Sequence, residues 1–230
     1  MRHCLDARKV NMASGRVFVL ESPNPLELLE GTGERSSLQQ VCALLGHDVS
    51  SFLLRDKAEF IQTCQYVSAI KGDKDDKSPM FLHISLHGNA SGIGLGRELI
   101  TWSELSIIIQ RMYEGLCYYH GPVILILSAC GANKQQLTAK LTNAVKAASE
   151  PFVPPEYLFV FSDDEVDWRD AVVTWTIFYR YAPKINFLTE KAKVQTLLNR
   201  ICRAGCGKLT YFRWDGAADI YRRYQAPSPT

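Results

Sequence analysis

The sequence predicts a three-layer α/β/α sandwich whose central sheet is mostly parallel and has about six strands. Two observations lead to this fold class. Unbroken apolar runs, such as residues 81–86 and 123–129, are typical of strands buried on both faces, which occur in parallel sheets covered by helices. These runs alternate along the chain with segments of helical periodicity, and such a β-α-β-α order places helices on both faces of the sheet.

The N-terminal part of the chain is expected to hold two strands and two helices. The apolar run at 17–20 is the first strand, since a Pro-Asn-Pro sequence follows it closely. Residues 36–45 carry apolar side chains at helical spacing and stop at a glycine. A strand at 49–54 precedes the second helix, which begins at residue 56 or 57 and extends to about residue 70.

The remaining elements follow the same alternation. A glycine-rich loop at 88–96 comes after the strand at 81–86. Thr101 and Glu104 form a capping-box pattern, which opens a helix that extends to about residue 118. The elements expected beyond it are a strand at 123–129, a helix at 135–148, a strand at 157–161, helices at 169–181 and 188–203, and a strand at 208–214.

Length and composition indicate one domain in the cytoplasm. The 230 residues, 47% of them hydrophobic, are enough for one α/β domain, with a polar N-terminal extension at 1–15 and a C-terminal tail at 216–230. The formal charge of +2 is spread along the chain, so neither nucleic acid nor a membrane is expected as a partner. No stretch approaches the roughly 18 to 20 apolar residues of a membrane span. Seven cysteines, an odd number, fit a reducing compartment.

Two of the apolar runs end in a reactive residue. His87 follows the run at 81–86, and Cys130 follows the run at 123–129. Adjacent parallel strands open at their carboxyl ends on one crevice, which is where open α/β sheets bind ligands. We therefore expect the imidazole and the thiol to meet there. A neighbouring imidazole favours the thiolate, which is the form that attacks a carbonyl. Taken alone, a cysteine at a strand end is usually a small buried apolar residue.

The order of these motifs resembles a known family. His87-Gly88, the segments 93–95 and 100–105, and Ser-Ala-Cys-Gly at 128–131 follow one another as in caspase-like cysteine peptidases of clan CD, in particular the CHAT group. Residues 166–171, which contain a tryptophan, are similar to the stretch after the fifth strand in that family, where a tryptophan helps to form the substrate cleft. The resemblance covers roughly residues 15 to 215 and implies the caspase-like form of the α/β/α sandwich.

The resemblance implies a catalytic dyad. Cys130 would attack the peptide carbonyl, and His87 would protonate the leaving amine and then help to activate water. Backbone N–H groups of Gly88 and Cys130 would hold the oxyanion. The family needs no cofactor, and no acid in the sequence is assigned to orient His87. No metal site is expected, because Cys202 and Cys206 have no neighbouring histidine or acid pair.

Substrate preference is where the sequence departs from the family. Caspases hold an acidic P1 side chain, the one on the acyl side of the cut, partly through a glutamine two residues before the nucleophile; Ser128 occupies that position here. Arg169 follows Trp168 much as an arginine does in caspases, but acids at 163–165 and 167 suit a basic P1 residue. Weighing four acids against one arginine, we favour a basic or uncharged P1 residue. The predicted substrate-binding residues are Ser128, Asp163, Asp164, Trp168 and Arg169.

The predicted function is that of a caspase-like cysteine endopeptidase that makes limited cuts in protein substrates. By analogy with the family, an activating protein partner or homodimerisation would regulate it, in an immune or stress pathway. Only residues 150–156 separate the helix after the nucleophile from the next strand, so obligatory cleavage into two subunits is not expected. Two alternatives stay open: a non-catalytic caspase-like interaction module that uses the same cleft, and a thiol enzyme that hydrolyses small acyl or amide substrates.

Overall fold

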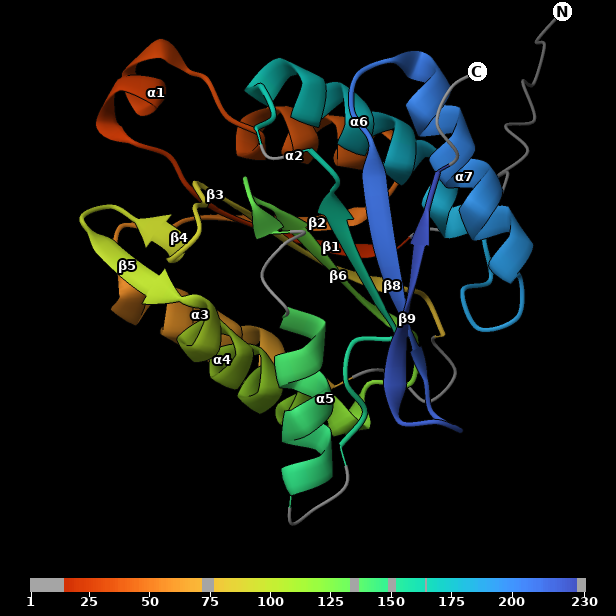
Figure 1. The fold of residues 1–230 in the computed structure, drawn as a ribbon. Coiled ribbons are helices and arrows are strands. Elements are labelled where there is room, and N and C mark those ends of the chain that lie inside the picture. The colour runs from red at the N-terminus through yellow and green to blue at the C-terminus, as the bar shows by residue number, and fades with distance from the viewer. Residues whose placement is uncertain (1–14, 72–76, 133–136, 149–151, 164, 227–230) are drawn as a thin grey trace, which may run out of the picture.

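The structure, a computed structural model of the 230-residue chain, describes residues 15–71, 77–132, 137–148, 152–163 and 165–226. A seven-stranded sheet is its middle layer, and helices cover both faces (Figure 1). The predicted fold class is confirmed, and the sheet is slightly larger than predicted. In spatial order the strands are β2 (Asp48–Leu53), β1 (Arg16–Ser22), β3 (Met80–Leu86), β6 (Val123–Ser128), β7 (Tyr157–Phe161), β8 (Leu209–Asp215) and β9 (Ile220–Gln225).

The first five strands of this order are parallel, whereas β8 and β9 run antiparallel to their neighbours. Every residue of β3, β6 and β7 is buried, as their unbroken apolar sequences predict. Successive residues of a strand face opposite layers, so Val17 and Val19 belong to one core while Phe18 and Leu20 belong to the other. Because the parallel strands point the same way, their carboxyl ends share one edge of the sheet.

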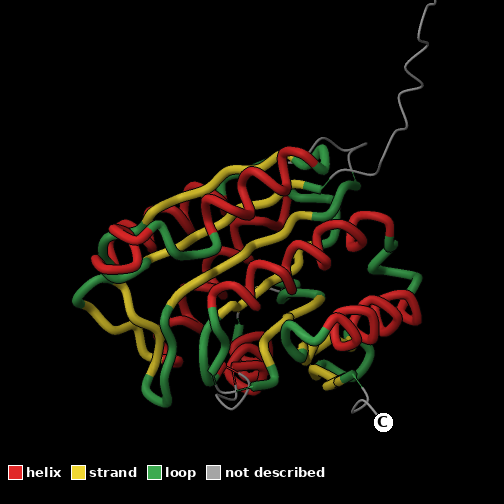
Figure 2. The backbone as a smooth tube through the Cα atoms, turned by 90° about the horizontal axis from the view of Figure 1, so that it is seen from above, coloured by secondary structure: helices red, strands yellow, loops and turns green. Residues whose placement is uncertain are grey.

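Among the described residues, three α-helices pack on each face of the sheet. On the lower face in Figure 1 lie α3 (Lys57–Ser68), α4 (Trp102–Gly115) and α5 (Leu137–Ala147). On the upper face lie α2 (Arg35–Leu44), α6 (Trp168–Tyr181) and α7 (Lys191–Ala204). The view from above shows helices lying over the strands (Figure 2). Two 3₁₀ helices, η1 (Leu116–Tyr118) and η3 (Ala182–Lys184), follow α4 and α6. The predicted helices are thus confirmed within a few residues at each end.

Four elements that the structure describes are absent from the sequence-based prediction. The tail expected at 216–230 contains strand β9, whose residues are mostly exposed and therefore show no apolar run. A hairpin joins β4 (Gly92–Leu95), in the glycine-rich loop, to β5 (Glu98–Thr101), just beyond that loop. Its turn includes Gly96, whose positive φ of 59° favours glycine. A short helix, α1 (Pro25–Glu30), follows β1, and in Figure 1 it lies at the same end of the sheet as this hairpin.

Side-chain caps fix where several helices begin. The predicted capping box at α4 is confirmed. The Thr101 side chain accepts the backbone N–H of Glu104, and the Glu104 side chain accepts the backbone N–H of Thr101. Asn24 and Glu27 form a second capping box, which begins α1. Asp167 accepts the N–H of Arg169 at the start of α6. The helices that flank the carboxyl edge of the sheet therefore have defined first turns.

Among the helices that the structure describes, none is long and apolar enough to cross a membrane.

Candidate active site

His87 and Cys130 leave two neighbouring strands at the same level. In the register of β3 and β6, Ser85 pairs with Ser128. His87 lies two residues beyond Ser85, and Cys130 lies two residues beyond Ser128. Neighbouring strands of a sheet are about 4.8 Å apart. Both residues line one pocket. The structure therefore brings together the two residues in which the apolar runs end, at the carboxyl edge of the sheet.

Two glycines let the main chains approach each other behind this pair. A Cβ at Gly88 would lie 2.3 Å from the carbonyl oxygen of Cys130 and 3.2 Å from its nitrogen, so any side chain there would clash. Gly131 has a φ of +72°, a conformation that favours glycine. The backbone of Gly88 thus packs directly against the backbone of Cys130. These are the two residues whose N–H groups are predicted to share an oxyanion.

The pocket at this edge has a volume of about 60 Å³, which leaves room for a few water-sized groups. Cys130 is partly exposed and carries a free thiol. Two further polar residues, Glu34 and Ser128, also line the pocket. The walls are largely apolar and come from the ends of β3 and β7, the residue after β6, the loop before α6 and the start of α6: Leu86, Ala129, Phe161, Val166, Trp168 and Ala171.

The carboxylate of Glu27 contacts the ring of His87. The Oε2 atom of Glu27 lies 2.8 Å from His87 Nε2. The side chain of Glu27 is 14% exposed and that of His87 is 48% exposed, so the imidazole stands at the surface while its partner is largely covered. Glu27 comes from α1, directly after β1, and sequence reasoning did not assign it.

The other oxygen of Glu27 holds Trp168. The indole Nε1–H of Trp168 donates to Glu27 Oε1 at 2.9 Å, and the indole packs edge-to-face on the His87 ring, with centroids 5.5 Å apart. Burial raises the pKa of Glu27, but hydrogen bonds from His87, Trp168 and the N–H of Asn24 outweigh it, and the pKa is lowered overall. Glu27 is therefore a carboxylate at neutral pH, fixed by donors on both oxygens.

Helix α1, which carries Glu27, has no buried residue. Its leucines Leu26, Leu28 and Leu29 are 68%, 54% and 84% exposed. The helix is held by its capping box, by Gly31 in the left-handed conformation at its end, and by the contacts of Glu27. The pattern Asn-x-x-Glu at 24–27, directly after a predicted parallel strand, is the one signal in the sequence that could have located this residue.

A buried polar network lies on the inner side of the pocket. Glu34, which precedes α2, accepts at Oε1 from the hydroxyl of Ser128 at 2.5 Å, and its Oε2 lies 2.6 Å from His83 Nε2. The indole of Trp175 donates to Ser128 Oγ at 2.9 Å. On the far side, His83 Nδ1 lies 2.9 Å from the Tyr179 hydroxyl. These groups are all buried, and Glu34 and Ser128 line the pocket.

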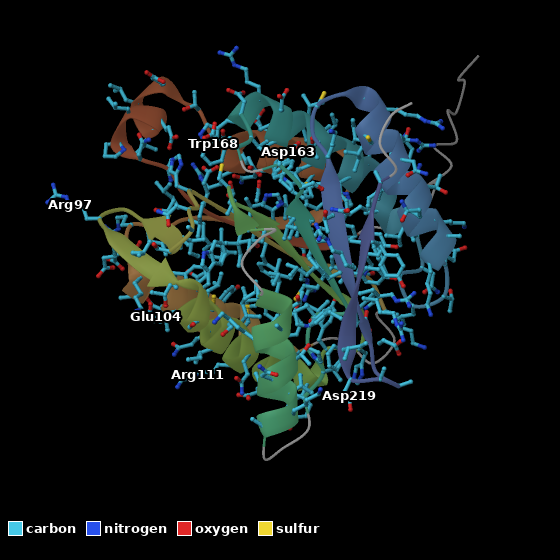
Figure 3. The ribbon with its side chains drawn as sticks, in the orientation of Figure 1. Arg97, Glu104, Arg111, Asp163, Trp168 and Asp219 are labelled. Carbon is cyan, nitrogen blue, oxygen red and sulfur yellow. The ribbon has the colours of Figure 1, made fainter. Side chains whose placement is uncertain are left out.

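The predicted substrate-binding residues divide into two groups. Ser128 and Trp168 line the pocket beside Cys130. Asp163 and Arg169 are exposed and do not line it, and Asp164 lies outside the described residues. Figure 3 labels Trp168 and Asp163 in the upper part of the molecule, near the start of α6, whereas Glu104, Arg111 and Asp219 lie in the lower part. The structure thus brings two of the five toward the thiol.

Comparison with known proteins gives no assignment: the chain matches no protein-family model and no curated protein sequence. In the part of the chain that the structure describes, no three His, Cys, Asp or Glu side chains gather as metal ligands would. The thiol of Cys130, the imidazole of His87 and the acid Glu34 thus belong to residues that line one small pocket at the sheet edge. A second acid, Glu27, contacts the imidazole.

Proposed function

We propose that the chain is a cysteine endopeptidase of the caspase-like type, with Cys130 as nucleophile and His87 as general acid and base. One observation carries the proposal: thiol and imidazole residues end neighbouring parallel strands and line one pocket, at the edge where open α/β sheets bind ligands. Gly88 supports it, because the absence of a side chain lets its main chain pack against that of Cys130 and so brings together the two residues whose N–H groups would hold the oxyanion.

The reaction proceeds through a thioester. The thiol of Cys130 passes its proton to His87 and its sulfur attacks the carbonyl carbon, while the N–H groups of Gly88 and Cys130 stabilise the oxyanion. The C–N bond breaks as His87 passes a proton to the leaving amine, and the acyl group stays on the sulfur. Water, which loses a proton to His87, then attacks the thioester and releases the carboxylic acid and the thiol.

Glu27 adds a positioning residue to this pair. It holds Nε2 of His87, so Nδ1 is the ring nitrogen left to exchange protons with the thiol and the substrate. Its negative charge also stabilises the imidazolium that forms during each transfer. Glu27 touches none of the reacting atoms, and its effect is to fix the ring and to balance the ring's charge.

The proposal is tested by mapping new protein N-termini after the purified chain is incubated with a native cell lysate, which also supplies proteins able to activate it. The variants Cys130→Ala and His87→Ala should abolish the new termini. Cys117→Ala is the matched control, because it removes an exposed thiol elsewhere and should leave the termini unchanged. New termini that persist in Cys130→Ala would refute the assignment of the nucleophile.

The wild type and Cys130→Ala, incubated with the same lysate, also distinguish the two alternative functions from a peptidase. Proteins captured equally by the wild type and Cys130→Ala, without any cleavage, would favour an interaction module. A thioester formed at Cys130 from a small acyl donor, again without peptide cleavage, would favour a hydrolase of small substrates. Intact-mass measurement of the chain distinguishes this thioester from the free thiol.

A further inference from the structure

The pocket beside Cys130 contains a buried acid. Glu34 is 1% exposed, yet it lines the pocket together with Cys130 and Ser128. Buried carboxylates are found where cations or hydrogen-bond donors compensate their charge. The identity of the groups that face Glu34 therefore determines what the pocket can receive.

Two buried groups face the carboxyl group of Glu34. Ser128 Oγ accepts the indole N–H of Trp175, so its own hydrogen is directed to Glu34 Oε1. His83 Nε2 lies 2.6 Å from Glu34 Oε2. On the other side of the ring, His83 Nδ1 lies 2.9 Å from the Tyr179 hydroxyl, and burial raises the pKa of that phenol well above its ordinary value.

Basic groups near Glu34 are two histidines, His83 beside its Oε2 and His87 in the pocket lining. The described residues that line the pocket include no lysine or arginine. Nε of the neighbouring Arg35 lies 4.0 Å from Glu21 Oε2. A carboxylate has about four acceptor positions, and Ser128 and His83 occupy two of those on Glu34. The carboxyl group of Glu34 thus has unused acceptor capacity.

The walls suit the stem of a basic side chain. Phe161, Val166, Trp168 and Ala171 contribute apolar side chains to the same pocket as Glu34, and lysine and arginine bury their methylene stems along such surface while the charged head reaches a polar group. An acidic side chain would instead face Glu34 with no lysine or arginine among the described lining residues to pair with.

Resting on the proposed peptidase function, we infer that this pocket receives the P1 side chain of the substrate and selects lysine or arginine through the carboxylate of Glu34. The sequence predicts a basic or uncharged P1 residue from its loop acids; this inference narrows the choice to a basic residue and assigns the recognition to Glu34 instead of the loop. The loop acid Asp163 is exposed and lies outside the pocket, whereas Glu34 stands inside it.

The first experiment measures kcat/KM on peptides that differ only at P1. Arginine is compared with citrulline, which has nearly the same shape without the charge, and lysine is compared with acetyl-lysine. The wild type should prefer each charged residue by about 100-fold. Glu34→Gln keeps the shape of the side chain, and the His83 ring can reverse its donor and acceptor atoms to suit the amide; the preference should fall below about 10-fold. Glu34→Asp retains the charge and should retain the preference.

Two control variants test whether Glu34, and not an exposed acid nearby, causes the P1 preference. Asp170→Asn removes an exposed acid from α6 beside the lining residue Ala171 and should leave the P1 ratio within about twofold. The double variant Asp163→Asn, Glu165→Gln removes acids of the loop. The inference would be overturned if the double variant lost the preference for a charged P1 residue while Glu34→Gln kept it. The loop acids would then be the source of the preference.

A binding measurement makes the inference independent of catalysis. The indole N–H signals of Trp168 and Trp175, assigned with Trp→Phe variants, are followed by NMR during titration with n-butylguanidinium and with its neutral counterpart n-butylurea. Butylguanidinium alone should shift them, and Glu34→Gln should abolish the shift. If the two compounds act alike, the inference is wrong.

The outcomes separate the two proposals. Cleavage that depends on Cys130 but follows neutral or acidic residues would overturn the assignment of Glu34 and leave the peptidase function standing. Absence of any cleavage that depends on Cys130 would refute the peptidase function, and the titration with n-butylguanidinium would then decide whether the pocket binds cations.

Discussion

The carboxylate of Glu27 and the imidazole of His87 lie 2.8 Å apart although 60 positions separate them in the sequence. The contact joins the helix after β1 to the end of β3, two strands that are parallel neighbours in the sheet. The order of strands reverses between β1 and β3, since β2 lies outside β1 while β6 and β7 follow β3. Such a reversal opens a crevice at the strand ends; Glu27 and His87 follow the two strands that flank it, and Cys130 follows the next strand, β6.

Replacing Glu27 by glutamine should lower kcat by about 100-fold and leave KM nearly unchanged. The amide keeps the size of the side chain but removes the charge that balances the imidazolium. Steady-state kinetics on a cleaved peptide measures both constants. Glu30→Gln, which removes an exposed acid from the same helix, is the control. A rise in KM alone would contradict a positioning role.

Replacing Trp168 by phenylalanine should lower kcat/KM by roughly 5- to 10-fold, which is the effect of losing one hydrogen bond to a carboxylate. The ring that packs on His87 is largely kept, but the donor to Glu27 Oε1 is lost. Trp214→Phe, in β8, should have no such effect. If Trp168→Phe retains full activity, the indole N–H does not help to hold Glu27.

Replacing Gly88 by alanine should destabilise the fold by about 1–3 kcal/mol, because the new methyl group overlaps the carbonyl oxygen of Cys130. It should also reduce the rate at which iodoacetamide labels Cys130. Gly94→Ala is a matched control, since its Cβ would have no atom nearer than 3.9 Å. Denaturant unfolding measures stability, and equal stability of the two variants would contradict the close approach.

Glu156 should make stability fall as the pH rises from about 4.5 to about 7. Burial raises the pKa of Glu156 to about 7 from an ordinary value of 4.5, and its Oε2 has no hydrogen-bond partner among the described residues. Between these values the unfolded chain ionises first, so the folded state loses stability, and above the folded pKa the loss is complete. Glu156→Gln should therefore be more stable than the wild type by roughly 1–3 kcal/mol at pH 8.

The difference should vanish near pH 4, where Glu156 is protonated in both states. Thermal unfolding at a series of pH values measures it. A difference that stays constant across the series would mean that the carboxyl group is not the cause.

Much of the fold and part of the site follow from local sequence pattern. The parallel strands are unbroken apolar runs, and the residues that end such runs must lie at one edge of the sheet. That reasoning locates His87 and Cys130 without knowledge of the helices. Strand β9 was missed because it lies at the end of the sheet with mostly exposed side chains, so it has no apolar run to detect.

Glu27 and Glu34 could not be predicted in the same way. Their roles depend on contacts between segments far apart in the sequence, and each lies in a polar stretch rich in turn residues between β1 and α2. Glu27 had a local signal, the capping box with Asn24, which predicts a helix start but not the contact with His87. The loop acids were given a role from charge alone, while burial, which the sequence does not show, distinguishes Glu34 from them.

Helix α1 has one further consequence for the proposed enzyme. Its six residues include none that is buried, so it can unwind at little cost while the seven-stranded sheet stays intact. In conformations where α1 has unwound, His87 loses its acidic partner. The temperature at which activity declines is then set by this short helix and should lie below the melting temperature of the core. Amide hydrogen exchange in 25–30 should accordingly be faster than exchange in β3 and β6.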